Sequence, residues 1–357
     1  MIVQGNVDAI VGLQYGDEGK GKVTAGIVSA NNYDLTVRFN GGPNAGHTIV
    51  REDFLSFKLH QLPSSIAYNK PGYIAPGCVL NLKKLYEEIQ IVERTDPSIK
   101  VKDLLQIHPN VPIIKDKHIE VDANNQYETQ GSTKQGIAPA YADFYNRSAT
   151  LLKCIAHTFK YPQKTAKDIL VESAQGFYLD PFNGSYPYTT SSHCLPAAAA
   201  ATVGFDPKKF KRIFGVAKCY ETRSGTDPNF YAPSPHAYSI AKYSDQLNNL
   251  VSAGREYGVT TGRQRKVRFL DLNSLMNASI KTGTTDLIIN KWDVFQQIEK
   301  YSLVFDNELT TFKTIENMKN YICNTFYNFY RFHNQIVPNI YFSSSPTLEK
   351  GLINLND

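Results

Sequence analysis

Cysteine is scarce in this sequence and follows no recognisable pattern. The 357 residues contain five cysteines, which are widely spaced and odd in number: Cys78, Cys154, Cys194, Cys219 and Cys323. Without a Cys-x-x-Cys pair, neither a cysteine zinc site nor a disulfide framework is indicated. The sequence also lacks an apolar run of membrane-spanning length, and its N-terminus has no basic segment followed by an apolar one. We therefore expect a cytoplasmic protein without a membrane partner.

The basic residues do not gather in a long run either. The net charge is +5 and the isoelectric point is near 8.7, with 42% apolar and 20% charged residues. This balance is that of an ordinary globular protein, and no nucleic-acid partner is expected from it. A mild positive excess suits an enzyme that holds several phosphates and carboxylates. A chain of this length can bury a large sheet, and we expect one domain over residues 1–357 with insertions.

Short apolar runs, each followed by a polar or glycine-bearing loop, recur along the chain and predict strands. They lie at 7–14, 35–39, 168–171, 212–217, 287–289 and 340–342. Helices are expected between them, for example over 82–94 and 294–301, whereas the polar stretch 124–147 is expected to be a long functional loop. Alternating strands and helices predict an α/β fold, with a mostly parallel central sheet flanked by helices and small helical subdomain insertions.

A glycine-rich segment follows the first predicted strand: Gly16-Asp17-Glu18-Gly19-Lys20-Gly21-Lys22. It fits the P-loop-like pattern Gly-x-x-x-x-Gly-Lys, in which backbone N–H groups cradle phosphate. The next residue is Val23, where a Walker-type loop needs a hydroxyl for magnesium, so Asp17 becomes the candidate metal ligand. A plain structural turn is the alternative. Acids within a phosphate loop are costly unless they bind a metal or move a proton, which favours the functional reading.

Seven segments, in order along nearly the whole chain, closely resemble the motifs of the adenylosuccinate synthetase family. They are residues 14–22, 44–48, 131–141, 172–176, 186–192, 258–265 and 290–293. The resemblance implies a ligase that joins L-aspartate to C6 of a purine mononucleotide through a 6-phosphoryl intermediate. It implies catalytic roles for Asp17 as general base, for His47 beside the transferred phosphoryl group, and for Gln175 at the 6-oxo group. By itself, His47 would more often be a loop histidine that hydrogen-bonds the backbone; its setting within Asn44–Thr48, after a strand and facing the acidic loop, favours the catalytic role.

The resemblance also implies the ligand contacts. Magnesium would bind Asp17 and the carbonyl of Gly46. The purine monophosphate would contact Asp17, Lys20, Asn44, Thr133, Arg147, Gln175, Thr190 and Arg263. L-aspartate would contact Val259, Thr260, Thr261 and Arg263. The triphosphate would contact Gly16, Glu18, Gly19, Lys20, Gly21, Lys22, Gly46, Thr48, Arg265, Lys291, Asp293, Ser343, Ser345 and Pro346.

In this family the arginine that matches Arg147 reaches into the neighbouring subunit's site, which implies a homodimer. A solvated surface charge is the alternative reading for Arg147. A carboxylate at Asp293 favours GTP as the phosphoryl donor, because guanine offers it two N–H donors. Ser345 stands where a glycine is usual in the family, and this leaves ATP open as the donor.

The compact length is similar to that of archaeal and bacteriophage members. Some phage members use GMP or dGMP and make a 2-aminoadenylosuccinate, and they often replace the first acidic residue of the glycine-rich loop. Retention of Asp17 favours IMP as the acceptor. A protein of another class, a GTP-hydrolysing switch module, is disfavoured by Val23 and by the second binding segment at 260–265.

Overall fold

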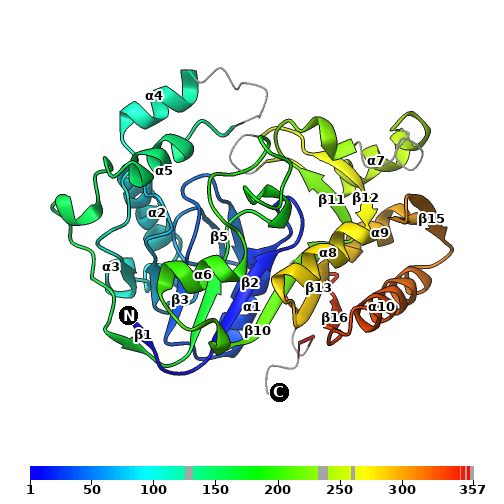
Figure 1. Cartoon of the computed structure of the whole chain (residues 1–357), viewed down its shortest axis with the longest axis horizontal. Coiled ribbons are helices and arrows are strands. Elements are labelled where there is room, and N and C mark those ends of the chain that lie inside the picture. The colour runs from blue at the N-terminus through cyan, green and yellow to red at the C-terminus, as the bar shows by residue number, and fades with distance from the viewer. Residues whose placement is uncertain (125–131, 232–239, 259–261, 346, 350–351, 354–357) are drawn as a thin grey trace.

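The computed structural model describes residues 1–124, 132–231, 240–258, 262–345, 347–349 and 352–353. Its centre is an eight-stranded sheet, in the order β16-β13-β10-β2-β9-β3-β6-β7, in which every neighbouring pair is parallel (Figure 1). The strands are β16 (Asn339–Phe342), β13 (Asp286–Asn290), β10 (Phe210–Lys218), β2 (Val7–Gly12), β9 (Ile169–Glu172), β3 (Leu35–Arg38), β6 (Gly72–Ile74) and β7 (Leu105–Ile107). The predicted parallel α/β sheet flanked by helices is confirmed.

The central strand β2 is buried on both of its faces, as strands of parallel sheets are. Val7 and Ala9 pack in one apolar cluster with residues of α6 (Pro196–Val203). Ile10 packs in another with residues of α1 (Lys20–Ala30). Alternate side chains of β2 therefore hold a helix on each side of the sheet, and α1 is fixed directly after the loop that follows β2.

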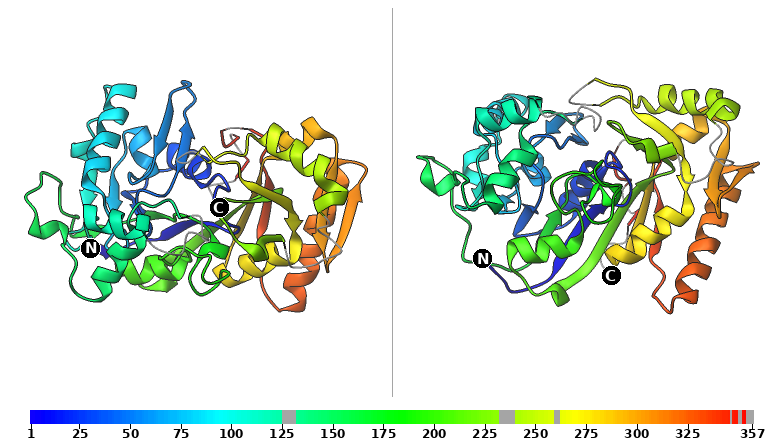
Figure 2. Two further views of the ribbon diagram at one scale, coloured as in Figure 1. Left: turned by 90° about the horizontal axis from the view of Figure 1, so that it is seen from above. Right: turned by 45° about the horizontal axis from the view of Figure 1, so that its top comes forward.

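Two groups of elements lie beside the sheet (Figures 1 and 2). One group contains α2 (Leu82–Thr95), α3 (Val101–Leu104), α4 (Asp116–Asn124), α5 (Ile137–Tyr145) and the hairpin of β4 (His47–Val50) and β5 (Ser56–Leu59). The other contains a sheet of β11 (Tyr220–Arg223), β12 (Lys266–Asp271), β14 (Tyr301–Phe305) and β15 (Glu308–Phe312), with α7 (Ile240–Gly254), α8 (Leu272–Thr282), α9 (Trp292–Ile298) and α10 (Ile315–Phe332). A short pair, β1 (Ile2–Val3) and β8 (Thr165–Ala166), lies near the N-terminus.

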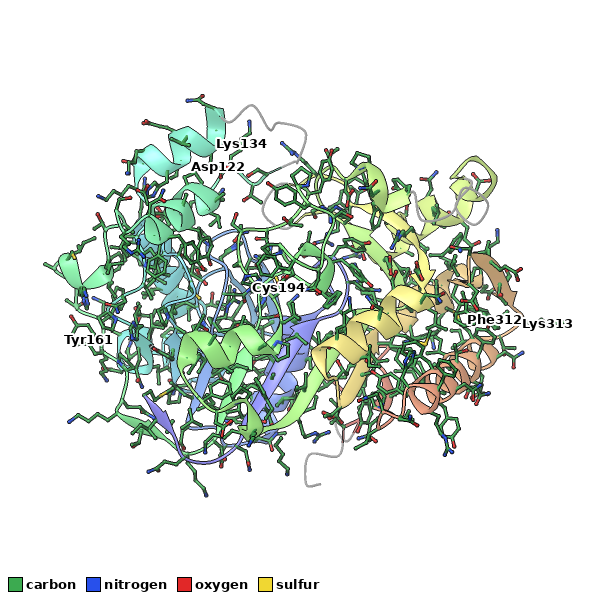
Figure 3. All side chains as sticks on the ribbon, in the orientation of Figure 1. Asp122, Lys134, Tyr161, Cys194, Phe312 and Lys313 are labelled. Atoms are coloured by element: carbon green, nitrogen blue, oxygen red, sulfur yellow. The ribbon has the colours of Figure 1, made fainter. Side chains whose placement is uncertain are left out.

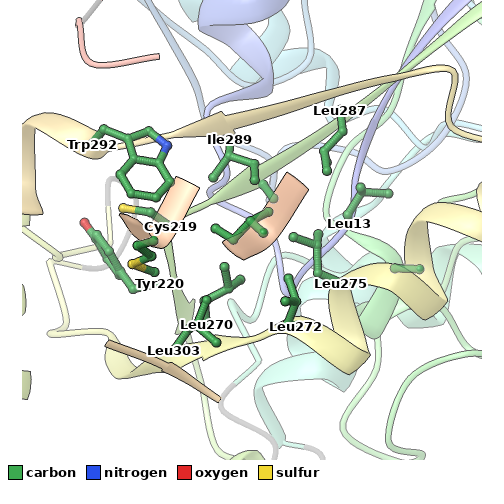
Figure 4. Close-up of a cluster of buried hydrophobic side chains, with 14 of the residues drawn as sticks. Leu13, Cys219, Tyr220, Leu270, Leu272, Leu275, Leu287, Ile289, Trp292 and Leu303 are labelled. Carbon is green, nitrogen blue, oxygen red and sulfur yellow. The ribbon is translucent and has the colours of Figure 1, made fainter. Parts of the chain in front are cut away.

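The second group is joined to the sheet by a large apolar cluster. Leu287 and Ile289 of β13 and Leu275 of α8 pack there with Trp292 at the start of α9 (Figure 4). Because Tyr220 of β11 and Leu270 of β12 belong to the same cluster, it fixes the end of β13 relative to the smaller sheet. None of the described helices combines the length and apolarity needed to cross a bilayer.

The six predicted strands are all confirmed in the central sheet, and the helix predicted over 82–94 is α2. The helix predicted over 294–301 is wrong at its end, because α9 stops at Ile298 and β14 begins at Tyr301. The loop predicted over 124–147 is also wrong in part, since α5 spans Ile137–Tyr145. Ile137 and Tyr141 of α5 are buried in one apolar cluster with Val79.

Candidate active site

The glycine-rich loop lies at the carboxyl end of β2 and leads into α1, which begins at Lys20. Gly19 caps this helix with φ 94°, a left-handed conformation that glycine adopts without strain. Gly21 lies so close to β4 that a Cβ there would stand 3.0 Å from Cβ of His47. These glycines therefore bring the helix N-terminus, where backbone N–H groups favour anions, against His47.

A cavity of about 640 Å³ opens at this edge of the sheet. Among the described residues, the predicted site residues that line it are Gly16, Asp17, Gly19, Lys20, Gly21, Asn44, Gly46, His47, Thr48, Thr133, Gln175, Thr190, Arg263, Arg265 and Lys291. They come from segments that follow β2, β3, β9 and β13 and from the segment before β12. The structure thus gathers residues spread over most of the chain at the carboxyl ends of the strands, where parallel sheets bind ligands.

Glu18 is turned into the protein and does not line this cavity. Its carboxylate accepts from the backbone N–H of Gly16 at 2.9 Å and of Gln14 at 3.2 Å, and it pairs with Lys20 at 2.6 Å. Lys20 also donates to the backbone carbonyl of Gln175. The electrostatic cost of placing Glu18 in this loop is therefore offset by its contacts within the loop. These contacts shape the loop and fix the side chain of Lys20.

Asp17 is the acid of the loop that faces the cavity. Its backbone is left-handed, with φ 59°, and its side chain remains 31% exposed. The Nε atom of Arg265 lies 2.8 Å from its Oδ2 atom. An accessible carboxylate beside a cation can take a proton or bind a hard cation such as Mg²⁺.

His47 is almost completely buried at the start of β4. Its Nδ1 atom lies 3.0 Å from Nη1 of Arg38 and 3.3 Å from Oε1 of Glu172. Burial, together with the charge of Arg38, lowers the pKa of His47 to about 4. Burial alone would raise the pKa of Glu172, but its contact with His47 and the charge of Arg38 hold it at about 2. Near neutral pH the imidazole is therefore uncharged and can donate a single N–H.

Gln175 presents buried polar atoms without a partner. It follows β9 with φ 58°, and neither its Nε2 nor its Oε1 atom has a hydrogen bond within the described structure. The Oδ1 atom of Asn44, on the same cavity, is also unpaired. Buried polar groups are normally satisfied. These amides therefore point to a ligand that supplies both donors and acceptors.

Several residues that line the cavity carry no role in the sequence prediction. Asp122, near the end of α4, and Lys134 close one side of it (Figure 3). Tyr15 and Arg223 line it too, and the guanidinium of Arg223 lies 5.3 Å from the centroid of the Tyr15 ring. Tyr15 directly precedes the glycine-rich loop, which was an available signal. The sequence around Arg223 carried no such signal, because only the pairing of β11 with β12 brings Arg223 to the cavity.

A sequence profile of the adenylosuccinate synthetase family matches residues 9–165 and 153–325. The chain belongs to this family. It is 31% identical to the chloroplastic adenylosuccinate synthetase of Ostreococcus tauri, covering 88% of this chain and 74% of that protein. The adenylosuccinate synthetase of Petrotoga mobilis is 32% identical, over 82% of this chain and 79% of that protein. The chain is accordingly a ligase-class enzyme, and its family acts on a purine nucleotide, aspartate and a nucleoside triphosphate.

Solved structures show the same fold. Fully ligated adenylosuccinate synthetase from Plasmodium falciparum aligns with a TM-score of 0.77 and 24% identity, covering 96% of this chain and 98% of that one. The succinoaminodeoxyadenylate synthetase of cyanophage S-2L, bound to dGMP and dATP, aligns with a TM-score of 0.72 and 21% identity, covering 96% and 94%. At these identities the likeness establishes the fold and leaves the acceptor base open.

Some predicted triphosphate residues do not line the cavity and form a second cluster around Lys22 of α1. Lys22 donates to the carbonyl of Ser345 at 2.6 Å and to the hydroxyl of Ser343. Burial lowers the pKa of Lys22 to about 8. Asp293 lies in the first turn of α9, near enough to act on the charge of Lys22. Predicted triphosphate residues of α1, of α9 and of the segment after β16 are thus brought together, although outside the cavity.

Four predicted residues lie outside the described part of the chain: Val259, Thr260, Thr261 and Pro346. Arg147 is exposed after α5 with φ 64°, and it does not line the cavity of its own chain. Within the described ranges no group of three His, Cys, Asp or Glu side chains could hold a metal. A single carboxylate, Asp17, still fits Mg²⁺, because this ion takes its other ligands from phosphate and water.

A larger cavity, of about 730 Å³, lies on the other side of α1 and does not contain these residues. Its one arginine, Arg51, is engaged by Asp96 at 2.6 Å and by Asp53, and it donates to the carbonyl of Ala67. Among the described residues that line this cavity, no cation is left unpaired to hold an anion. The smaller cavity, with its unpaired amides and the helix N-terminus, is the better candidate for the active site.

Proposed function

We propose that this enzyme makes adenylosuccinate from IMP and L-aspartate, with GTP converted to GDP and phosphate. The observation that carries the proposal is the position of Asp17: its accessible carboxylate, within the glycine-rich loop, lines the same cavity as the unpaired amide of Gln175. A base at this place can remove the N1 proton of a 6-oxopurine, which makes O6 nucleophilic towards the γ-phosphorus.

The neighbouring residues suit the charge that develops in this step. Neutral His47 donates an N–H to the transferred phosphoryl group, while Lys20 and the backbone N–H groups of the loop neutralise phosphate oxygens. The amide of Gln175 matches a 6-oxo or 6-phosphoryl group, because it offers both a donor and an acceptor. The amino group of aspartate then attacks C6 and phosphate leaves. Magnesium, held by Asp17 and the carbonyl of Gly46, would supply positive charge to the phosphates.

We propose Arg263 as the cation for the aspartate carboxylate, together with the segment 259–261. Arg263 lines the cavity, two residues before Arg265, which lies beside Asp17. A guanidinium suits a carboxylate because it can donate two parallel N–H groups. For the donor base we propose recognition of guanine by Asp293, which lies in the first turn of α9, shortly after β13 ends at Asn290.

The exposed position of Arg147 supports a homodimer in which this residue completes the neighbour's site. Arg147 is exposed, carries a backbone φ of 64° and does not line the cavity of its own chain. The purine monophosphate would then be held by Asn44, Thr133 and Thr190 of one subunit and by the partner's arginine.

The test offers the purified protein L-aspartate and GTP with IMP, dIMP, GMP or dGMP in separate reactions. The succinyl nucleotide is followed by chromatography and absorbance. Turnover of IMP that requires both aspartate and GTP is expected. Turnover of dGMP or GMP without IMP would replace the acceptor by a 2-aminopurine, as in the phage-type reaction. Hydrolysis of GTP without aspartate and acceptor would instead indicate a GTP-hydrolysing switch.

A further inference from the structure

A buried ion pair lies directly behind Arg265. Nζ of Lys218 is 3.2 Å from Oε1 of Glu256, and both side chains are only 1% exposed. The Tyr220 hydroxyl donates to the same oxygen at 2.7 Å. The other oxygen of Glu256, Oε2, accepts from Nη1 of Arg265 at 2.6 Å. Lys218 at the end of β10 and Tyr220 in β11 therefore fix the carboxylate to which Arg265 binds.

Glu256 also holds the backbone of Arg265. The N–H of Arg265 donates to the carbonyl oxygen of Glu256 at 2.9 Å. Burial alone would raise the pKa of Glu256, but the charges of Lys218 and Arg265 hold it at about 2. Glu256 is therefore anionic at neutral pH. It accepts hydrogen bonds from both the backbone N–H and the guanidinium of Arg265.

The guanidinium of Arg265 is shared between two carboxylates. Nη1 contacts Glu256 at 2.6 Å, and Nε lies 2.8 Å from Oδ2 of Asp17. Asp17 is the proposed base, and Arg265 is the proposed contact of the triphosphate. In the absence of Glu256, Asp17 would be the nearest anion left to Arg265, and the guanidinium would pair with it more strongly.

We propose that Glu256 is a positioning residue that holds Arg265 for the triphosphate by keeping Nη1, so that Arg265 meets Asp17 through Nε. This inference rests on the proposed function of the same site. Glu256 is absent from the cavity lining, so it acts through Arg265 and touches no substrate. With Nη1 anchored on Glu256, a triphosphate that binds Arg265 competes with Asp17 for the Nε side of the guanidinium.

The test compares the wild type with Glu256→Gln, whose amide has nearly the same shape and no charge. The KM for GTP is expected to rise about tenfold, the loss of one charge-assisted contact. The KM for L-aspartate and for the purine monophosphate should stay within about twofold of the wild type. Direct calorimetric binding of GTP with Mg²⁺ should weaken by the same factor. A purely structural role would lower the amount of active enzyme without changing one KM selectively.

Two further variants keep the inference falsifiable if Glu256→Gln folds poorly. Lys218→Met combined with Glu256→Gln removes both charges of the buried pair, so no uncompensated lysine is left in the interior. This double variant should show the same rise in the KM for GTP. In an Arg265→Met background, Glu256→Gln should have no further effect on the GTP constants, because its action passes through Arg265. Asp286→Asn, which breaks a buried pair with Arg212 at the amino end of β13, is the matched control without an effect on KM.

An unchanged KM for GTP in both Glu256 variants would overturn the inference. An equal rise in the KM for L-aspartate would also overturn it, as would a rise in the GTP constants that persists when Glu256→Gln is made in the Arg265→Met background. Absence of aspartate-dependent turnover in the wild type would instead overturn the proposed function. The two failures are therefore distinguishable.

Discussion

Replacing Gln175 by methionine should make the free protein more stable and the enzyme much worse. Both polar atoms of the Gln175 side chain are buried without a hydrogen bond in the described structure. Each buried polar group left unpaired costs about 1–3 kcal/mol. Methionine has a similar length and no such groups, and the strain of φ 58° is common to both residues. The free energy of unfolding should therefore rise by about 1–3 kcal/mol.

The same change should weaken binding of the purine monophosphate about tenfold to a hundredfold, because its 6-substituent loses a donor and an acceptor. Urea unfolding of the ligand-free protein and calorimetric titration with IMP measure the two effects. Gln14→Met is the matched control. Its amide is equally buried but donates to the carbonyl of Lys218 at 3.1 Å and accepts from the Lys218 N–H at 2.9 Å. This control should destabilise the protein.

A Gln175→Met protein that is less stable than the wild type would show that the amide has partners in the free state. Unchanged IMP affinity would show that Gln175 does not touch the nucleotide. Either result refutes the reasoning that an unpaired buried amide marks a ligand contact.

Three further predictions concern the charged residues, and a fourth concerns the dimer. Asp17→Asn should lower kcat by a factor of about 10² to 10⁴ with the fold intact, because an amide cannot take the N1 proton. A fall in kcat smaller than about 10²-fold would remove Asp17 from the base role. Glu172→Gln should destabilise by about 3–5 kcal/mol at pH 7, since it leaves Arg38 buried without its carboxylate. The pKa of Glu172 in the folded protein is about 2, below its ordinary 4.5. The wild type should therefore lose about 3 kcal/mol of unfolding free energy as the pH falls from 4.5 to 2, and the Glu172→Gln variant should not show this loss. Asp293→Asn should lower kcat/KM for GTP about tenfold to a hundredfold with little change for ATP, and equal losses for both would argue against guanine recognition. Mixing refolded Asp17→Asn and Arg147→Ala subunits should restore about a quarter of wild-type activity, because half of the random dimers are mixed and each has one complete site; no recovery would contradict a shared site.

Much of the central sheet could be predicted because its strands are marked locally. The runs around β2, β9 and β13 are apolar on both faces and end in glycine or polar residues, which is the pattern of buried parallel strands. The helix α5 was missed because the polar residues before it led to one loop being predicted over 124–147, although Ile137–Tyr145 is itself mostly apolar. The three-residue strands β6 and β7 were too short to give a periodic signal.

The site shows the same division between local pattern and long-range contact. The glycine-rich loop and the segment after β3 carry their chemistry in contiguous residues, so Asp17, Lys20 and His47 were identified together. Glu18 has the same local setting as Asp17 but faces inward to Lys20. Spacing alone could not tell these two acids apart, because the direction of each depends on the left-handed backbone of the loop.

By itself the sequence determined six of the eight central strands and the glycine-rich turn after the first of them, and it supplied the candidate site residues, because these depend on residue type and short spacing. Only the tertiary structure decided which of these side chains meet. Arg265 reaches Asp17 because β11 and β12 pair antiparallel and because Lys218 and Glu256 fix the segment from behind. Such contacts join residues about two hundred and fifty positions apart, and their energy depends on burial and distance, which no local pattern contains.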